Sequence, residues 1–250
     1  MLAAAIAGLS ISAAQAETTL RMAHFWPGPS GVNQDVLQAW ADTIAEESNG
    51  ELTIQMFPAG TLAKPDSIYE AAANGIADIG ATAQGYTAGR FPLSQIVELP
   101  GVASTATQGA CVLQTLYDDG HLDSEYEDTR PLFMFTTGPG GIHTIDTDVQ
   151  TPRRSAGSAH SSPPPQWRVR CWKIWGASPV GMPAPDIYTS MQRGVIEGLS
   201  FPWEGLKGFR INELVNYHTE VPFYTLIFVA TMNQRSYDSL TPRAAGGDRQ

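Results

Sequence analysis

The sequence PDSIYEAAANGIAD at residues 65–78 recurs in altered form as PDIYTSMQRGVIE at residues 185–197. In each copy a Pro-Asp pair marks the start of a helix, and a glycine six residues after the tyrosine marks its end. An apolar run follows each glycine. The shared positions are Ile68, Tyr69, Gly75, Ile76 and Asp78 in the first copy, and Ile187, Tyr188, Gly194, Val195 and Glu197 in the second.

A helix-turn-strand unit that occurs twice predicts two similar α/β lobes, and a cleft between lobes is a common place for a small ligand. Chance similarity between two ordinary helix ends is the alternative. The tyrosine of each copy is expected in the core.

The surrounding pattern supports a parallel α/β sheet. Expected strands and helices alternate over residues 20–24, 33–48, 51–57, 65–75 and 76–82, which is a βαβαβ order. Farther along we expect a helix at 109–120, a strand at 131–136 and a central, β-favouring strand at 222–232.

The N-terminus predicts export. Residues 1–16 hold a short apolar run that ends in Ala14-Gln15-Ala16, which is typical of a secretory signal peptide and too short for a membrane span. No Lys or Arg precedes the apolar run, which allows for a start codon upstream; a buried N-terminal helix is the alternative. We therefore expect an exported protein.

The amino-acid composition limits the classes of molecule that the chain can bind. The net charge is −10 and the isoelectric point is near 4.8, which argues against nucleic acid or an anionic membrane surface as partner. No other apolar run is long enough for a membrane span. Cys111 and Cys171 could pair in an oxidising compartment, and two cysteines leave that question open.

Several ordered segments carry a family resemblance. They are Leu20-Arg21-Met22-Ala23-His24, the spaced motif from Gly50 to Leu62, Gly75-Ile76-Ala77-Asp78-Ile79, Glu98-Leu99-Pro100-Gly101, and Gly176-Ala177-Ser178-Pro179-Val180 with the second repeat and Pro202. Over 20–152 and 176–242 the chain resembles the extracytoplasmic solute receptors of tripartite ATP-independent periplasmic (TRAP) transporters, the DctP-like family.

The resemblance implies two α/β lobes, with parallel or mixed sheets, joined by hinge strands and spanned by a long helix, which close over a ligand. We place the first lobe at 17–140 and the second at 141–242. The ligand implied is an organic acid anion, a carboxylate, and the partner is a TRAP membrane permease. Neither an enzymatic activity nor a cofactor is implied.

Residues 153–175 depart from this pattern. They hold three of the six Trp, four of the twelve Arg, no acidic residue and three consecutive prolines, without helical or strand periodicity. Reading GC-rich codons for Trp167–Trp175 from the third base gives Ala-Gly-Glu-Val-Leu-Glu-Asp-Leu, an amphipathic helix. Residues 243–250 behave similarly, so we hypothesise two reading-frame errors, the second ending the chain early. A genuine Pro/Arg-rich linker is the alternative.

These departures predict a weakened receptor. In the family, the segment after Thr151-Pro152 carries an Arg that clamps the ligand carboxylate, and no residue here matches it. The final elements of the family, including much of the long helix, are also absent. We expect the 250-residue chain to be poorly stable and to bind weakly or not at all, an expectation that tight carboxylate binding would contradict.

No catalytic constellation is found. The five histidines are scattered without metal-ligand spacing, the Gly-rich stretch at 138–141 lacks the Lys-Ser/Thr of a phosphate loop, and no Gly-x-Ser-x-Gly occurs. Candidate ligand-binding residues are placed at strand ends and after the second repeat: His24, Trp26, Gln84, Phe201, Trp203, Glu204, His218 and Phe223.

Each candidate has an alternative role. His24 is as readily a satisfied histidine beside core aromatics. Phe201 stands where the family often has Asn, which favours a larger or aromatic organic acid over a small dicarboxylate. Trp203-Glu204 also resembles receptors for 2-oxo acids that bind a metal ion, although a solvated Glu204 is the simpler interpretation.

Three functions follow. The first, implied by the resemblance, is a periplasmic TRAP receptor that closes over an organic acid anion and delivers it to a permease. The second is a secreted enzyme on the same frame, which turnover of a chromogenic ester or amide would reveal. The third is a degraded gene product without function.

Overall fold

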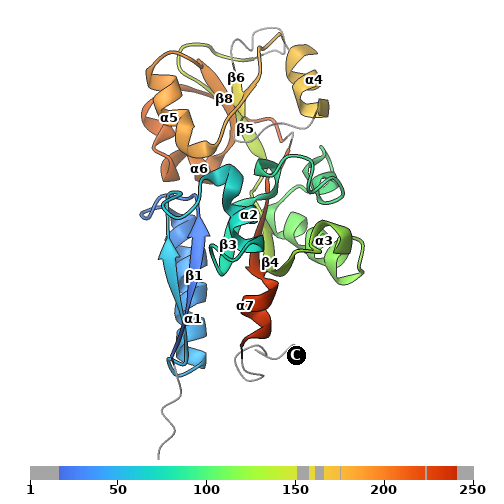
Figure 1. Ribbon diagram of the computed structural model, residues 1–250. Coiled ribbons are helices and arrows are strands. Elements are labelled where there is room, and N and C mark those ends of the chain that lie inside the picture. Colours follow the sequence, from blue (N-terminus) through green and yellow to red (C-terminus); the bar gives the residue numbers. More distant parts are fainter. Residues whose placement is uncertain (1–16, 151–157, 161–165, 175, 223, 241–250) are drawn as a thin grey trace, which may run out of the picture.

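The computed structural model describes residues 17–150, 158–160, 166–174, 176–222 and 224–240. Two mixed five-stranded sheets form two lobes, stacked one above the other in Figure 1. The lower sheet has the strand order β2-β1-β3-β10-β4, and the upper sheet has the order β7-β6-β8-β5-β9. The predicted two-lobed α/β fold is therefore confirmed.

The strands of the lower sheet are β1 (Thr18–His24), β2 (Leu52–Phe57), β3 (Ile79–Ala83), β4 (Thr129–Thr136) and β10 (Ile227–Asn233). Those of the upper sheet are β5 (Gly140–Thr144), β6 (Ser158–His160), β7 (Val180–Gly181), β8 (Gly198–Pro202) and β9 (Tyr217–Thr219).

The α-helices are α1 (Ala39–Glu47), α2 (Ile68–Ala73), α3 (Ala106–Asp118), α4 (Gln166–Ile174), α5 (Ala184–Gln192), α6 (Trp203–Gly208) and α7 (Gln234–Asp238). Short 3-10 segments lie at Pro65–Ser67, Gln84–Tyr86, Ser94–Glu98, Asp123–Glu125 and Ile211–Glu213, and a π-helical segment, η1 (Val32–Gln38), precedes α1.

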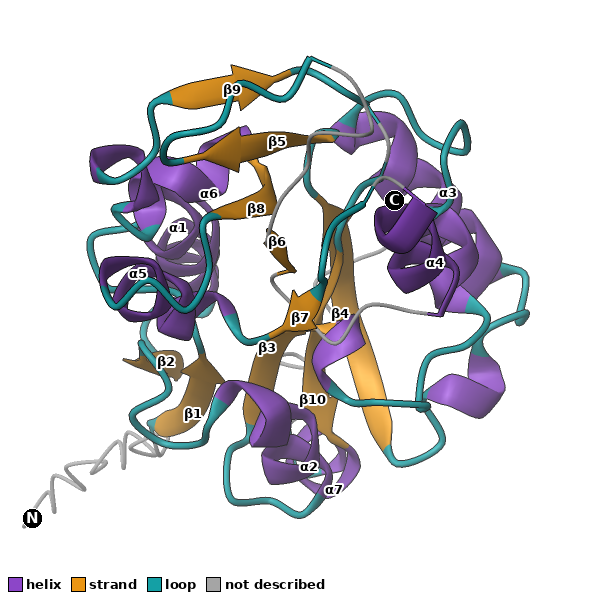
Figure 2. Ribbon diagram, turned by 90° about the horizontal axis from the view of Figure 1, so that it is seen from above, coloured by secondary structure: helices purple, strands orange, loops and turns teal. Residues whose placement is uncertain are grey.

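The two sheets repeat one topology. In the lower sheet β2, β1 and β3 run parallel, and β10 is antiparallel to its neighbours β3 and β4. In the upper sheet β7, β6 and β8 run parallel, and β5 is antiparallel to its neighbours β8 and β9. Figure 2, viewed from above, shows the helices placed around both sheets. The predicted parallel βαβαβ order is confirmed.

The sequence repeat occupies equivalent places in this topology. Gly75 and Gly194 end α2 and α5 at φ +75° and +70°. Four residues after each glycine, β3 and β8 begin, and each is the parallel strand beside the antiparallel one. The two copies are thus one backbone unit used once in each lobe.

Two crossing segments connect the sheets. Residues 137–139 lead from β4 to β5, and residues 220–222 and 224–226, the described part of the second segment, lie between β9 and β10. They are hydrogen-bonded to each other: Gly140 N donates to Tyr224 O at 2.8 Å, and Thr137 N donates to Leu226 O at 3.0 Å. The lower sheet consequently takes an interior strand, β10, from beyond the range predicted for the first lobe.

Some local expectations were wrong. The strand expected at 222–232 begins only at Ile227, and the helix expected at 33–48 starts with π geometry. Residues 158–160 form β6 and residues 166–174 form α4, with Trp172 fully buried, although this region lacks periodicity. Tyr69 is buried as expected, whereas Tyr188 is only half-buried.

Other expectations fall outside the described residues: the signal peptide at 1–16, part of the anomalous segment (153–157, 161–165 and 175) and the tail at 243–250. Cys111 and Cys171 are both free thiols. Among the described helices, none has the length and apolar character that crossing a bilayer requires.

Candidate functional site

A cavity of about 370 Å³ lies between the two lobes. Both lobes supply its wall, which is formed by Phe25, Trp26, Ser30, Gly31, Val32, Asp35, Val36, Ala83, Tyr86, Phe135, Thr136, Thr137, Ala184, Phe201, Pro202, Glu204, Gly205, Gly208, Phe209, Leu226 and Phe228. Its volume lies in the range of small-molecule sites.

Strand ends explain why these residues meet. Phe25 and Trp26 follow β1, Tyr86 lies just after β3, and Thr137 follows β4, all at the upper edge of the lower sheet. Ligands of open α/β sheets bind outside the carboxyl ends of strands, where successive loops converge. Phe201, the next-to-last residue of β8, lines the same cavity from the upper lobe.

Aromatic rings dominate the wall. Phe25 and Trp26 stack with centroids 4.0 Å apart, and the edge of one ring meets the face of the other between Phe25 and Tyr86 at 5.0 Å. Phe25 also lies 6.3 Å from Phe209 of the upper lobe, in a stacked orientation. The cavity therefore offers flat apolar faces from both lobes, which suit a planar ring.

One hydrogen bond joins the lobes at the cavity. The hydroxyl of Tyr86 accepts from the backbone N–H of Ala184, the first residue of α5, at 2.9 Å. Burial raises the pKa of Tyr86, and the nearby Asp186 raises it further, while the bond from Ala184 lowers it, so the hydroxyl stays protonated at neutral pH.

The charged residues of the described wall are both acidic. Asp35 and Glu204 are exposed, and Glu204 Oε1 accepts from the N–H of Gly138 in a crossing segment at 3.1 Å. No Lys or Arg lines the cavity within the described ranges. A bound carboxylate would therefore meet neutral donors rather than a cation from these residues.

Three of the predicted binding residues, Trp26, Phe201 and Glu204, line the cavity. Phe223 lies outside the described residues. The other four predicted residues are His24, Gln84, Trp203 and His218, and none of them is part of the cavity wall as described.

His24 and Gln84 are fully buried within the lower lobe. Burial lowers the pKa of His24 to about 4, against the raising effects of Asn33 and the Trp26 backbone, and neither of its ring nitrogens has a partner in hydrogen-bond geometry. Gln84 donates to the hydroxyl of Tyr126, which fixes it inside the lobe. Both side chains therefore lie inside the lower lobe at the ends of β1 and β3, and not in the cavity wall.

Trp203 and His218 form a cluster with a third residue, His143, on the upper lobe. His143 Nε2 lies 3.0 Å from the carbonyl of Phe201, so this nitrogen carries the proton and Nδ1 accepts. His218 Nδ1, 2.8 Å away, must then donate. The ring of Trp203 packs on both imidazoles, at 4.8 and 5.2 Å between centroids.

This cluster was missed in the sequence because antiparallel pairing of β5 with β9 joins histidines that are far apart in the chain. Burial is the main cause that lowers the pKa of His143 to about 4. Within the described residues, no three His, Cys, Asp or Glu side chains are grouped so as to hold a metal ion.

Most of the wall was also missed. Tyr86 follows Gln84 by two residues and enters the cavity in its place, and Thr137 directly follows a predicted strand. Their position after strands was the available signal. Phe209 and Phe228 carried no such signal, because α6 and β10 reach the cavity only through the tertiary fold.

Comparison with known proteins decides the family. The profile of the bacterial extracellular solute-binding protein family 7, DctP, matches residues 22–245. The chain belongs to this family. DctP members are solute-binding proteins and not enzymes, so the enzyme alternative is not retained.

Solved DctP-type structures superpose closely. A marine metagenome TRAP solute-binding protein specific for aromatic acid ligands, in complex with 3-hydroxybenzoate, is 31% identical with a TM-score of 0.85, over 92% of this chain and 72% of that one. A TRAP solute-binding protein of Rhodoferax ferrireducens with copurified benzoate is 32% identical with a TM-score of 0.85, over 91% and 72%.

A curated relative is more distant. The 2,3-diketo-L-gulonate-binding periplasmic protein of Escherichia coli is 22% identical over 208 residues, which are 80% of this chain and 62% of the relative. The chain thus spans less than two thirds of that relative's length.

Proposed function

We propose that this chain is the solute receptor of a TRAP transporter for an aromatic carboxylic acid with a single ring. The observation that carries the proposal is the cavity, whose wall brings seven aromatic side chains around about 370 Å³: Phe25, Trp26, Tyr86, Phe135, Phe201, Phe209 and Phe228. The similar proteins that hold 3-hydroxybenzoate and benzoate support the same class.

The wall argues against a sugar acid. A sugar acid carries several hydroxyl groups, and each needs a hydrogen-bond partner when it leaves water. Apart from four hydroxyl side chains, the described wall offers only the carboxylates of Asp35 and Glu204. A benzoate-sized ring instead buries apolar faces against Phe25 and Phe201, from opposite lobes.

The crossing segments supply the mechanism. Because residues 137–140 and 224–226 are bonded to each other, they join the lobes as one paired connection about which the cavity opens and closes. A ligand that contacts both lobes favours the closed arrangement. In this proposal the closed receptor, periplasmic as its relatives are, delivers its ligand to the membrane permease.

Calorimetric titration of the purified chain tests the proposal. Benzoate and 3-hydroxybenzoate are expected to bind more tightly than succinate or D-glucuronate at equal concentration and pH. A preference for succinate would contradict the aromatic assignment. The absence of binding by all four would instead support a degraded gene product.

Binding is expected to be weak in the chain as written, because the described wall lacks a basic side chain. The reading-frame hypothesis remains a prediction, and sequencing the gene across codons 150–178 and 240–250 tests it. A missing or added base there would restore the Arg-bearing segment, and the corrected protein should bind benzoate more tightly than this chain.

A further inference from the structure

Three hydroxyl groups in the cavity wall share one arrangement. Ser30, Tyr86 and Thr137 are each at most 6% exposed, and the oxygen of each accepts a hydrogen bond from a backbone N–H. The donors are Asn33 N to Ser30 Oγ at 3.3 Å, Ala184 N to Tyr86 Oη at 2.9 Å, and Leu226 N to Thr137 Oγ1 at 3.0 Å.

This arrangement leaves the three hydroxyl protons free. A hydroxyl has one proton to donate and two lone pairs, and here a backbone N–H engages one of the lone pairs. Across the described part of the chain, none of the three protons has an acceptor in hydrogen-bond geometry. Each of these protons is therefore available to an acceptor that enters the cavity, and a ligand carboxylate is such an acceptor.

Thr136 shows the contrast within the same wall. Its hydroxyl donates to the carbonyl of Ala106 at 2.9 Å and so has no proton left for a ligand. Thr137, the next residue, points its oxygen toward Leu226 N and keeps its proton. Of these two adjacent threonines, Thr136 uses its proton in a bond within the protein, and Thr137 keeps its proton available for a ligand.

The position of the three hydroxyls favours an anion. They lie after β1, β3 and β4, at the same edge of the lower sheet, and are buried, whereas the carboxylates of Asp35 and Glu204 are exposed. Each hydroxyl is also polarised by the N–H that it accepts, which strengthens it as a donor. The Tyr86 donor lies at the N-terminus of a nine-residue helix, whose dipole adds to this effect.

We propose that the hydroxyls of Ser30, Tyr86 and Thr137 hold the carboxylate of the aromatic acid, as three neutral donors in the place of a basic side chain. This inference rests on the proposed function. Because Tyr86 bonds to Ala184 of the upper lobe, the carboxylate also reinforces the bond that joins the lobes. Affinity for the anion and closure are then coupled through one side chain.

Paired titrations with benzoate and its neutral analogue benzamide test the inference. A merely structural defect weakens the binding of both ligands alike. Loss of a hydrogen-bond donor to the anion weakens the binding of benzoate selectively, because hydrogen bonds to a charged group are stronger. Tyr86→Phe and Thr137→Val are each expected to reduce benzoate affinity about tenfold or more, and benzamide affinity much less. Ser30→Ala should act in the same direction.

Matched controls lie outside the cavity. Tyr188→Phe removes a tyrosine hydroxyl that bonds to the exposed Glu213, and Thr231→Val removes a buried threonine hydroxyl of β10 that donates to Thr129. Both should leave the benzoate-to-benzamide ratio unchanged. Thr137→Ser keeps the hydroxyl and should restore the ratio lost in Thr137→Val.

The outcomes separate the two proposals. If the unchanged chain binds benzoate and the ratio survives both Tyr86→Phe and Thr137→Val, the hydroxyl assignment is wrong while the receptor assignment stands. If the unchanged chain binds neither benzoate nor 3-hydroxybenzoate, the proposed function fails and the hydroxyl assignment with it.

Discussion

The two repeat units share a backbone and differ in what their side chains do. In the lower lobe, Asp78 accepts hydrogen bonds from the backbone and guanidinium of Arg21 and from Ser236. Glu197, the equivalent residue in the upper lobe, is exposed, and its carboxylate has no hydrogen-bond or ion-pair partner among the described residues, although its backbone carbonyl accepts from Ile145 N. The acidic position is thus a link between strands in one lobe and a solvated side chain in the other.

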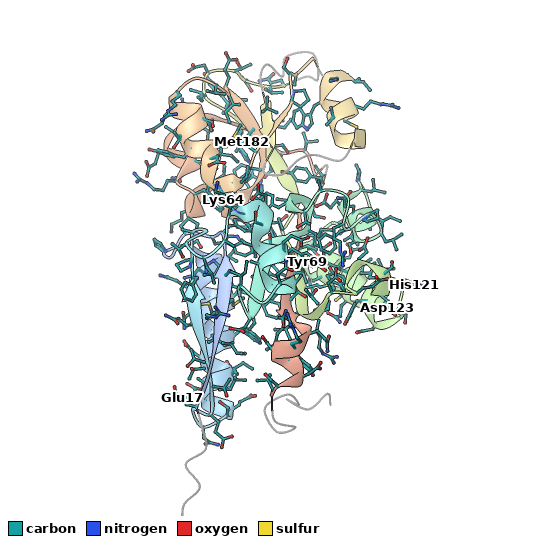
Figure 3. All side chains as sticks on the ribbon, viewed as in Figure 1. Glu17, Lys64, Tyr69, His121, Asp123 and Met182 are labelled. Atoms are coloured by element: carbon teal, nitrogen blue, oxygen red, sulfur yellow. The ribbon has the colours of Figure 1, made fainter. Side chains whose placement is uncertain are left out.

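The tyrosines differ in the same direction. Tyr69 is buried, as Figure 3 shows among the side chains of the lower lobe, and its hydroxyl contacts Arg90 at 3.0 Å and Thr129 at 3.3 Å. Tyr188 bonds to the exposed Glu213 at the surface. Local sequence therefore determines the helix end and the strand start, while neighbouring elements determine whether a side chain stabilises the fold.

Lowering the pH is expected to cause the largest change in the free energy of unfolding, because it acts on one buried histidine in each lobe. The folded pKa is about 4 for both His24 and His143, against 6.5 when unfolded. Between these values the unfolded chain binds more protons, so the free energy of unfolding falls as pH falls. Lowering the pH from 7.5 to 5 should cost about 2 kcal/mol for each histidine, measured by urea unfolding.

His143→Gln should roughly halve this pH dependence. His121→Gln, at an exposed position on the outer edge of the lower lobe (Figure 3), is the control substitution. Asp78 does not contribute in this window. Burial raises its pKa, but the bonds from Arg21 and Ser236 outweigh burial and lower it below the usual value, so it stays ionised. Equal slopes in all three proteins would contradict the assignment.

Removing the acidic residue of each unit tests the comparison directly. Asp78→Ala leaves the Arg21 N–H and the Ser236 hydroxyl without their acceptor and is expected to lower the free energy of unfolding by about 2 kcal/mol. Glu197→Ala should change it by less than about 0.5 kcal/mol. Equal losses in chemical unfolding would show that the two acids have the same role after all.

The tyrosine pair should show a smaller difference. Tyr69→Phe removes a buried hydroxyl that accepts from Arg90, with an expected loss of about 1 kcal/mol. Tyr188→Phe breaks a bond between exposed groups and should cost no more than a few tenths, roughly within error. Thermal unfolding of both variants at pH 7.5 measures the two losses of stability. A larger loss for Tyr188→Phe than for Tyr69→Phe would contradict the prediction.

The glycine pair should show no difference. Gly75→Ala and Gly194→Ala both place a side chain at positive φ. The added methyl would lie 3.7 Å from Asn233 Nδ2 at Gly75, an ordinary contact, and meets nothing within 4 Å at Gly194. Each substitution is expected to cost about 1 kcal/mol. Losses of unfolding free energy that differ by more than about 0.5 kcal/mol would mean that the cost of a non-glycine residue at the helix end differs between the two units.

The sequence alone predicted the features that depend on local pattern. The repeat, the parallel strand order and the helix at α3 follow from spacing. Of the predicted binding residues that line the cavity, Trp26 was proposed because it follows a strand, and Phe201 and Glu204 because they follow the second repeat, where the family resemblance places ligand contacts. Features that depend on distant partners were not predictable. The free protons of Tyr86 and Thr137 arise from bonds to Ala184 and Leu226, which are remote in the sequence.

The same limit applies to β10. Its composition indicated a central strand, but its place between β3 and β4 depends on the chain returning from the upper lobe through the second crossing segment. Likewise, the pairing of His143 with His218 needs the register of β5 against β9.

The place of β10 has a consequence for biogenesis. The lower sheet begins at Thr18 and is closed only by residues 227–233, so its interior cannot be completed until nearly all of the described chain has been synthesised. Contacts of such long range form slowly. A chain that is predicted to cross a membrane before folding gains from this delay, because an unfinished lower lobe keeps the polypeptide in a state that can still be threaded through a translocation channel.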